Sequence, residues 1–154
     1  MKEVLPIVVL ILGVLFVAYH GSSVQQSGPM NYSSFTIGNR SFAITYVATN
    51  QSSWESGLMN KTISNATTML FIFPNQGIYP FWMLDTYTNL DMYWIRGNAT
   101  SGRIVYIVRN ATSCFNAENC EIYTPNAAAN YVIETKAGAL QKASVELNDQ
   151  VGFK

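Results

Sequence analysis

The chain has 154 residues, of which 49% are apolar and 13% aromatic, and nine basic side chains balance nine acidic ones. Its aromatic content excludes a disordered protein, and its 12% of charged residues is about half the share in an average soluble domain. Zero net charge argues against a nucleic-acid partner, because neutralising phosphates requires a surplus of Lys and Arg.

The chain begins with an apolar segment: residues 4–19 carry no charge. As a helix, residues 4–21 would span about 27 Å, close to the ~30 Å hydrocarbon core of a bilayer. A cleaved secretory signal is the alternative, because small residues follow at 21–23. We predict a retained transmembrane helix over residues 1–21. Lys2 then keeps the amino terminus in the cytoplasm, as in a single-pass protein of the cell membrane.

Residues 22–30 are rich in Ser and Gln and predict a flexible tether. The remaining residues, 31–154, are enough for one hydrophobic core. We expect them to fold as one extracellular domain.

Short strands dominate the elements expected in that domain. Residues 35–37 and 41–47 flank Gly38-Asn39 and predict a hairpin. Ser52 and Glu55 match a capping box that would start a helix over residues 53–59. The apolar run 69–73 predicts a central strand that ends in a turn at 74–77.

Later in the chain, alternating or continuous apolar residues predict further strands at 79–83, 90–95, 103–108, 131–135 and 150–153. Both faces of the 103–108 strand are apolar, so it should lie inside the sheet. A helical turn is expected at 138–143. Together these elements predict a mainly β domain, a compact barrel-like or folded-over sheet with one or two short helices.

Seven asparagines have Ser or Thr two places later, whereas about two would be expected by chance from 14 Asn and 25 Ser or Thr in the sequence. This pattern is that of N-glycosylation acceptors, although Asn and Thr also cluster in turns. An extracellular or archaeal cell-surface glycoprotein explains the excess. The predicted acceptors are Asn31, Asn39, Asn50, Asn60, Asn65, Asn98 and Asn110.

Cys114 and Cys120 are separated by five residues. Outside the cytoplasm, two cysteines this close favour a disulfide over a redox or metal pair. We predict a disulfide that fixes one loop.

Several segments carry a recognisable pattern: residues 57–59, 69–74, 81–83, 102–105 and 131–134, with Thr86, Leu90, Asp91, Tyr123, Ala137 and Gly138. In order and spacing they resemble the family known as domain of unknown function 192, over about residues 42–151. The resemblance implies a compact, mainly β domain of exported or membrane-anchored prokaryotic proteins, with no established activity. Four positions depart from the family pattern: Leu84-Asp85 replaces the usual Lys-Asn, Asn89 replaces Pro, and Asn148 replaces Gly.

A binding patch is predicted from five residues, namely Trp82, Met83, Asp85, Asp91 and Glu134. We expect their segments to converge, either as an apolar ligand pocket or as a structural cluster. In the structural interpretation, which we favour, Asp91 accepts backbone N–H groups and Glu134 pairs with Arg103 or Arg109.

Chemistry-bearing motifs are sparse. Five methionines without histidine partners suggest core packing more than a copper site, and two cysteines with one histidine are too few for zinc. No metal or other cofactor is therefore expected, nor any catalytic residue. The sequence favours a non-enzymatic surface module, either a binding domain or an accessory subunit of a membrane or cell-surface complex. The alternative is an enzyme that uses carboxylates.

Overall fold

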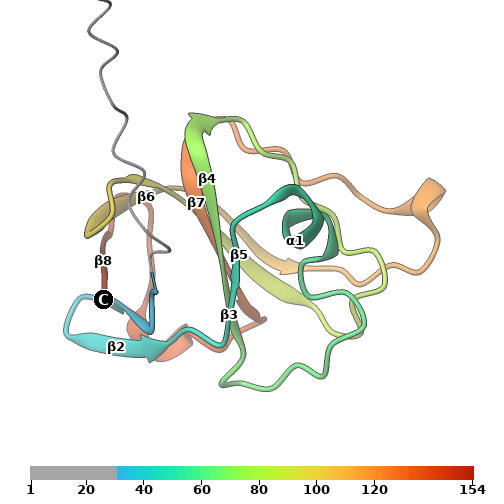
Figure 1. Cartoon of the computed structure of the whole chain (residues 1–154). Helices are drawn as coiled ribbons and strands as arrows, with labels where there is room; N and C mark the ends of the chain where they lie inside the picture. The colour runs from blue at the N-terminus through green and yellow to red at the C-terminus, as the bar shows by residue number, and fades with distance from the viewer. Residues whose placement is uncertain (1–30) are drawn as a thin grey trace, which may run out of the picture.

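The computed structural model describes residues 31–154, which form one mainly β domain (Figure 1). Its elements are β1 (Ser34–Ile37), β2 (Arg40–Ala43), β3 (Tyr46–Ala48), α1 (Gln51–Ser56), β4 (Thr68–Gly77), β5 (Leu90–Gly97), β6 (Ser101–Ala111), η1 (Ala117–Asn119), β7 (Ala129–Lys136), η2 (Gln141–Ala143) and β8 (Gln150–Phe153). The expected anchor and tether lie outside the described residues. Within residues 31–154, no helix is long and apolar enough to cross a membrane.

All the strands belong to one sheet, in the order β2-β1-β8-β6-β5-β7-β4-β3. Every neighbouring pair is antiparallel except β3 and β4. The sheet curls into a half-barrel, because Phe35 of β1 shares a buried cluster with Leu70 of β4 although four strands separate them in the sheet. The predicted folded-over β sheet is therefore confirmed.

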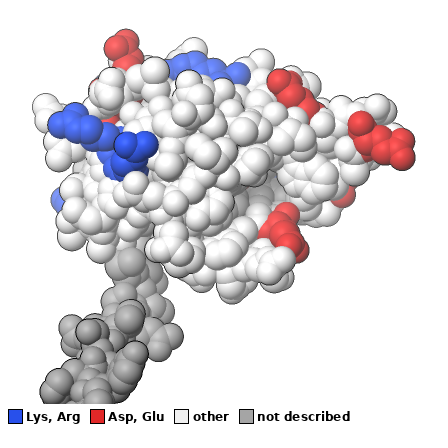
Figure 2. Space-filling model, turned by 90° about the horizontal axis from the view of Figure 1, so that it is seen from above, with Lys and Arg blue, Asp and Glu red and all other residues white. Residues whose placement is uncertain are grey.

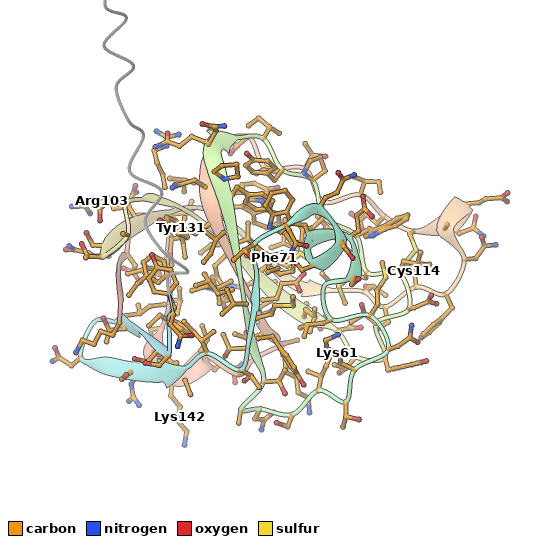
Figure 3. The ribbon with its side chains drawn as sticks, in the orientation of Figure 1. Lys61, Phe71, Arg103, Cys114, Tyr131 and Lys142 are labelled. Atoms are coloured by element: carbon orange, nitrogen blue, oxygen red, sulfur yellow. A yellow bond between two sulfur atoms is a disulfide. The ribbon has the colours of Figure 1, made fainter. Side chains whose placement is uncertain are left out.

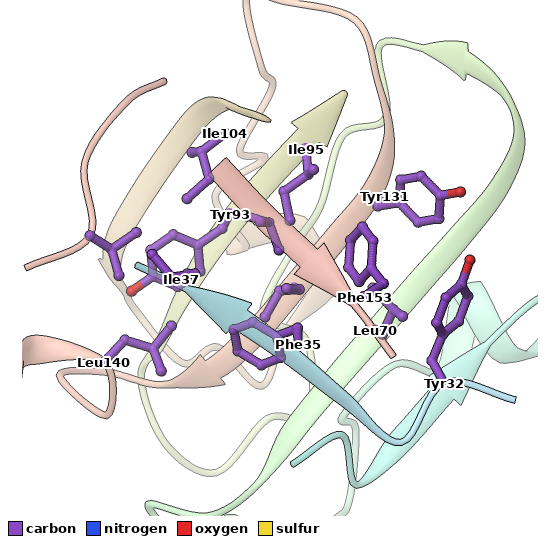
Figure 4. Packing of buried hydrophobic residues seen from close by; sticks show 13 residues of the cluster. Tyr32, Phe35, Ile37, Leu70, Tyr93, Ile95, Ile104, Tyr131, Leu140 and Phe153 are labelled. Carbon is purple, nitrogen blue, oxygen red and sulfur yellow. The ribbon is translucent and has the colours of Figure 1, made fainter. Parts of the chain in front are cut away.

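The two faces of the sheet bury two different clusters. The inner cluster fills the concave face and includes Phe35, Leu70 and Tyr93 (Figure 4). The outer cluster lies on the opposite face and includes Phe71, Met92 and Trp94. Successive residues of a strand point to opposite faces, so β4, β5 and β7 are buried on both sides. This double burial explains their nearly continuous apolar sequences.

The strands predicted near residues 90, 103, 131 and 150 are present as β5 to β8, and β6 lies inside the sheet as expected. The hairpin around Gly38-Asn39 is also confirmed. Its second strand, however, ends at Ala43, since Ile44 donates to the Ser33 carbonyl and Thr45 to that of Thr68. After Ala43 the chain therefore leaves the side of β1 and crosses to β4. Strand β3 then pairs with β4 in parallel.

The short helix starts earlier than predicted. Asn50 caps it: its side chain accepts from the Ser53 N–H, while the Ser53 hydroxyl accepts from the Asn50 N–H. The capping box is therefore Asn50 with Ser53, and Glu55 instead accepts from the Gln51 side chain. A side chain that caps from two positions earlier moves the whole helix toward the amino terminus.

Two predictions near the outer cluster were wrong. Strand β4 continues through residues 74–77, where a turn was expected, and residues 79–83 form no strand but a single bridge between Phe81 and Tyr123. This segment packs on the sheet through its aromatic rings, and Phe81 makes edge contacts with Phe71 and Trp94. The apolar residues of 79–83 therefore cover the outer face of the sheet instead of forming a strand within it.

The expected disulfide joins Cys114 to Cys120, with Cα atoms 5.5 Å apart. Figure 3 shows Cys114 on the side of the domain that carries α1, away from β2 and β8. Cys114 also bridges to Leu84. Closing so small a ring contributes about 2 kcal/mol by the loop-entropy estimate, so its role is to fix this loop beside residues 83–85.

Candidate functional site

A pocket of about 320 Å³ opens on the outer face of the sheet, between α1 and the segment after β4. Strands β4 and β7 form its floor. Its walls are mainly aromatic, and its lining includes Trp54, Gly57, Phe71, Phe73, Tyr79, Phe81, Trp82, Thr86 and Glu134. The volume and the apolar lining are those of a small-molecule site.

The aromatic walls are held in place by contacts with one another. Phe73 stacks on Tyr79 with ring centroids 3.7 Å apart, and Trp54 lies 5.0 Å from Phe73. On the other side, Phe81 meets Phe71 edge to face at 4.8 Å. Ring pairs in these arrangements add about 0.5–1.5 kcal/mol beyond their buried area. The walls are therefore preorganised.

Helix α1 brings its carboxyl end to the pocket. Gly57 ends the helix with φ of +44° and donates its N–H to the Ser53 carbonyl. A side chain at this position would be strained, and its Cβ would lie 3.4 Å from the Phe71 ring and 4.0 Å from Glu134 Oε2. Glycine therefore allows the backbone to pass close to this carboxyl group.

Glu134 lies at the floor of the pocket. It follows Val132 on the outer face of β7, and its cross-strand neighbours are Met92 on β5 and Met69 on β4. Its side chain is 3% exposed. No side chain or backbone group of residues 31–154 forms a hydrogen bond or ion pair with its carboxyl group.

Burial among these apolar neighbours raises the pKa of Glu134 to about 8. The group is therefore mostly protonated at neutral pH. A carboxyl group with a pKa close to the ambient pH can donate a hydrogen bond, accept one, or balance a positive charge.

Asp91 has a different environment. It lies on the inner side of β5 beside Thr135 of β7, and it accepts from the N–H of Asn110 at 2.8 Å and of Gly138 at 2.9 Å. Tyr93 donates its hydroxyl to the same carboxylate at 3.2 Å. Burial, followed by the Asp91 charge, raises the pKa of Tyr93, so its hydroxyl keeps its proton. The predicted role of Asp91 as an acceptor of backbone N–H bonds is confirmed.

The five residues of the predicted patch do not form one surface. Trp82 and Glu134 line the same pocket, whereas Asp91 faces the opposite side of the sheet. Met83 is buried in the outer cluster. Asp85 occupies a turn with φ of +49° and donates its N–H to the Cys114 carbonyl.

The predicted pairing of Glu134 with an arginine is wrong. Arg103 donates to the Asn148 carbonyl and Arg109 to the Val145 carbonyl. Both arginines are on β6, which β5 separates from β7. The order of the strands therefore keeps both arginines away from Glu134.

The remaining walls were not predicted as site residues. Trp54 lies within the helix expected over residues 53–59, and Phe73 and Tyr79 lie within expected strands. For Phe73 and Tyr79, a signal is the density of aromatic residues between 71 and 82, where five aromatic rings occur in twelve residues. Of the methionines considered for copper, Met69, Met83 and Met92 belong to the outer cluster. Residues 31–154 contain no cluster of three or more His, Cys, Asp or Glu that could hold a metal ion.

Residues 34–153 match the model of the DUF192 family, described as an uncharacterized ACR. A crystal structure of a candidate transcription regulator from Sinorhizobium meliloti 1021 is similar at 27% identity and a TM-score of 0.66, over 78% of this chain and 90% of that one. A protein of unknown function from Novosphingobium aromaticivorans shares the fold at 18% identity and a TM-score of 0.65, over 78% of this chain and 84% of the other. No curated protein matches the chain.

Proposed function

The chain belongs to the DUF192 family, and from this premise and the geometry of its pocket we propose that it is a membrane-anchored, extracytoplasmic binding module. The pocket under α1 is its ligand site. The module acts as a binding domain by itself or as the binding subunit of a membrane or cell-surface complex. No step of the proposal requires catalysis.

One observation carries this proposal: the buried carboxyl group of Glu134 opens into the pocket without a partner in residues 31–154. Burying such a group destabilises the folded state. Selection for stability alone would favour an apolar residue at this position, whereas a ligand site often accepts a loss of stability. Glu134 therefore serves binding more than folding.

The segments that carry the family resemblance support the same location. Four of them contribute lining residues: Gly57 from the segment 57–59, Phe71 and Phe73 from 69–74, Trp82 from 81–83, and Glu134 from 131–134. These segments are distant in the sequence and adjacent in the fold. Their convergence on one pocket supports its assignment as the ligand site.

The proposed location outside the cell depends on residues 1–21 as anchor and on N-glycans. All seven predicted acceptor asparagines are exposed, so sugars would not disturb the core. We expect native protein to retain its amino terminus and to carry glycans on several of these asparagines, with Asn39 and Asn98 at turns among them. Intact-mass and glycopeptide spectrometry on native membranes would measure both. A mature terminus near Ser23 would contradict the anchor, and unmodified asparagines throughout would contradict the glycans.

Binding is tested with a neutral aromatic probe. We expect indole to bind the full-length chain saturably in saturation-transfer NMR, and Trp82→Ala to weaken its affinity about tenfold, or 1.4 kcal/mol, because that side chain forms one wall. Trp82 is 38% exposed, so its removal leaves the core intact.

The matched control is Tyr87→Ala, which removes an aromatic ring that is 64% exposed and does not line this pocket. Its affinity for indole should equal that of the unaltered chain. Absence of saturable binding, or equal affinity of the Trp82→Ala protein, would contradict the proposed site.

A second candidate function is an enzyme in which Glu134 acts as a general acid or base. Its pKa of about 8 favours this alternative, because proton transfer is most efficient when the pKa lies near the working pH. Conversion of a bound compound by the unaltered chain, and its loss in Glu134→Gln, would support the enzyme over the binding module.

We do not propose that this chain regulates transcription, which is the role in the description of the Sinorhizobium protein. Binding to DNA requires a positively charged surface, whereas this chain has nine basic and nine acidic side chains. On the face shown in Figure 2, charged side chains form small separate groups on a largely uncharged surface. Such a surface favours recognition through an apolar pocket.

A further inference from the structure

We propose that the pocket recognises an organic ammonium ion, with the ammonium group at Glu134 and the apolar body of the ligand between the aromatic walls. This inference rests on the proposed binding function and specifies its ligand class. Three features of the pocket support it: the unpartnered acid, the aromatic walls and the small volume.

Residues 31–154 donate no hydrogen bond to the acid. Among the polar groups of the pocket wall, the Trp54 indole N–H donates to the carbonyls of Ala48 and Ile72, and the Tyr79 hydroxyl donates to the Asn75 carbonyl. Thr86 donates its hydroxyl to the Leu84 carbonyl. The lining contains no Lys, Arg or His from residues 31–154. In the described part of the chain no cation faces Glu134, so we assign the positive charge to the ligand.

The aromatic walls also favour a cation. Six rings line the pocket, those of Trp54, Phe71, Phe73, Tyr79, Phe81 and Trp82. The face of an aromatic ring attracts a cation, and tryptophan does so most strongly. A neutral ligand would make only apolar contacts with these rings. An ammonium ion would in addition be attracted by the ring quadrupoles and by the carboxylate.

The volume of about 320 Å³ limits the ligand to a small molecule. One amino group on a body the size of a single aromatic ring or a short alkyl chain fits this space. The carboxyl group of Glu134 is buried at the floor of the pocket, whereas the Trp82 wall is exposed to solvent. The ammonium group would therefore enter first.

Binding should depend on the ionisation of Glu134. The titratable groups that line the pocket with it are Glu55, on the exposed side of α1, and Tyr79. The neighbours of Glu134 on β4 and β5 are the uncharged Met69 and Met92. Since burial raises the pKa of Glu134 to about 8, the acid must release its proton to solvent before it can balance an ammonium charge. Affinity should then fall about tenfold for each pH unit below 8.

The test compares 2-phenylethylammonium with 2-phenylethanol, a neutral molecule of nearly the same shape, by isothermal titration of the full-length chain. At pH 8.5 we expect the ammonium ion to bind at least tenfold more tightly than the alcohol. Between pH 7.5 and pH 6 the affinity for the ammonium ion should fall about thirtyfold, while the affinity for the alcohol stays constant.

Two variants test whether Glu134 causes the preference for the cation. Glu134→Gln should abolish the preference for the cation and keep the affinity for the alcohol, which also shows that the variant is folded. Glu118→Gln, a change to an exposed acid outside the pocket lining, should retain the preference. Equal affinities for the two probes, or a preference that survives in Glu134→Gln, would overturn the ligand class alone. Absence of binding by both probes would overturn the proposed pocket function as well.

Discussion

Replacing Glu134 by glutamine is expected to stabilise the folded chain, by roughly 3 kcal/mol at pH 7 and roughly 5 kcal/mol above pH 8. The reason is the rise of its pKa from 4.5 to about 8 on burial, at 1.36 kcal/mol per pKa unit. Glutamine has the shape of the protonated acid and carries no charge that must be buried. Urea unfolding of the full-length chain, followed by tryptophan fluorescence, measures the difference.

The direction of this pH dependence follows from the protons that the folded and the unfolded chain bind. Between pH 4.5 and pH 8 the folded chain holds the Glu134 proton and the unfolded chain has released it, so the contribution of this group to stability falls as the pH rises. It is fully present below pH 4.5 and lost by the time the pH exceeds 8. The stability of the Glu134→Gln protein relative to the unaltered chain should therefore be zero at pH 4 and increase steadily to pH 8.

Glu55→Gln is the control, because Glu55 lines the same pocket but lies exposed on α1. Its effect on the free energy of unfolding should stay within about 0.5 kcal/mol at every pH. A Glu134→Gln protein that is less stable than the unaltered chain at pH 8 would show that the acid has a structural partner.

The opposite result is expected for Asp91. Asp91→Asn should lower the free energy of unfolding by roughly 2–4 kcal/mol at neutral pH, because one amide N–H₂ would replace an oxygen that accepts from Asn110, Gly138 or Tyr93. A buried donor left facing another donor loses its hydrogen bond and its hydration. The bonds from Asn110 and Gly138 connect β5 to the end of β6 and to the turn after β7. The loss should therefore appear as cooperative destabilisation in thermal and urea unfolding.

Asp149→Asn is the matched control for Asp91→Asn. Asp149 also accepts a backbone N–H, that of Glu146 at 2.8 Å, but this bond is exposed to solvent. Water can replace it, so the expected loss is below about 1 kcal/mol. Equal effects of the two substitutions would contradict the view that burial makes the Asp91 bonds important.

The two carboxylates illustrate what could be predicted about the site. Both are embedded in apolar strands, and the sequence identified both as candidates. Their roles differ because Asp91 lies opposite Thr135, and Glu134 therefore lies opposite Met92. Shifting the register of β5 against β7 by one residue would turn one strand over relative to the other and bring the two acids to the same face. Local sequence contains no information about this register.

The pocket walls illustrate the same point. Trp54 meets Phe73 although 18 residues separate them, and Phe73 stacks on Tyr79 because residues 79–83 fold back over β4 instead of forming a strand. Apolar residues that cover a sheet and apolar residues within it have similar periodicity. The expected strand at 79–83 was wrong for this reason.

The sequence by itself determined the mainly β class, the strands β5 to β8, the hairpin at Gly38-Asn39 and the disulfide between Cys114 and Cys120. These features depend on side-chain alternation, turn residues and short separations, all of which are local. Only the tertiary structure decided the order of the strands in the sheet, the passage from β2 to β3, and the face to which each acid points. Those depend on the pairing of distant strands, where a shift of one residue exchanges the two faces. Glu134 consequently became a pocket residue, and Asp91 became part of the framework.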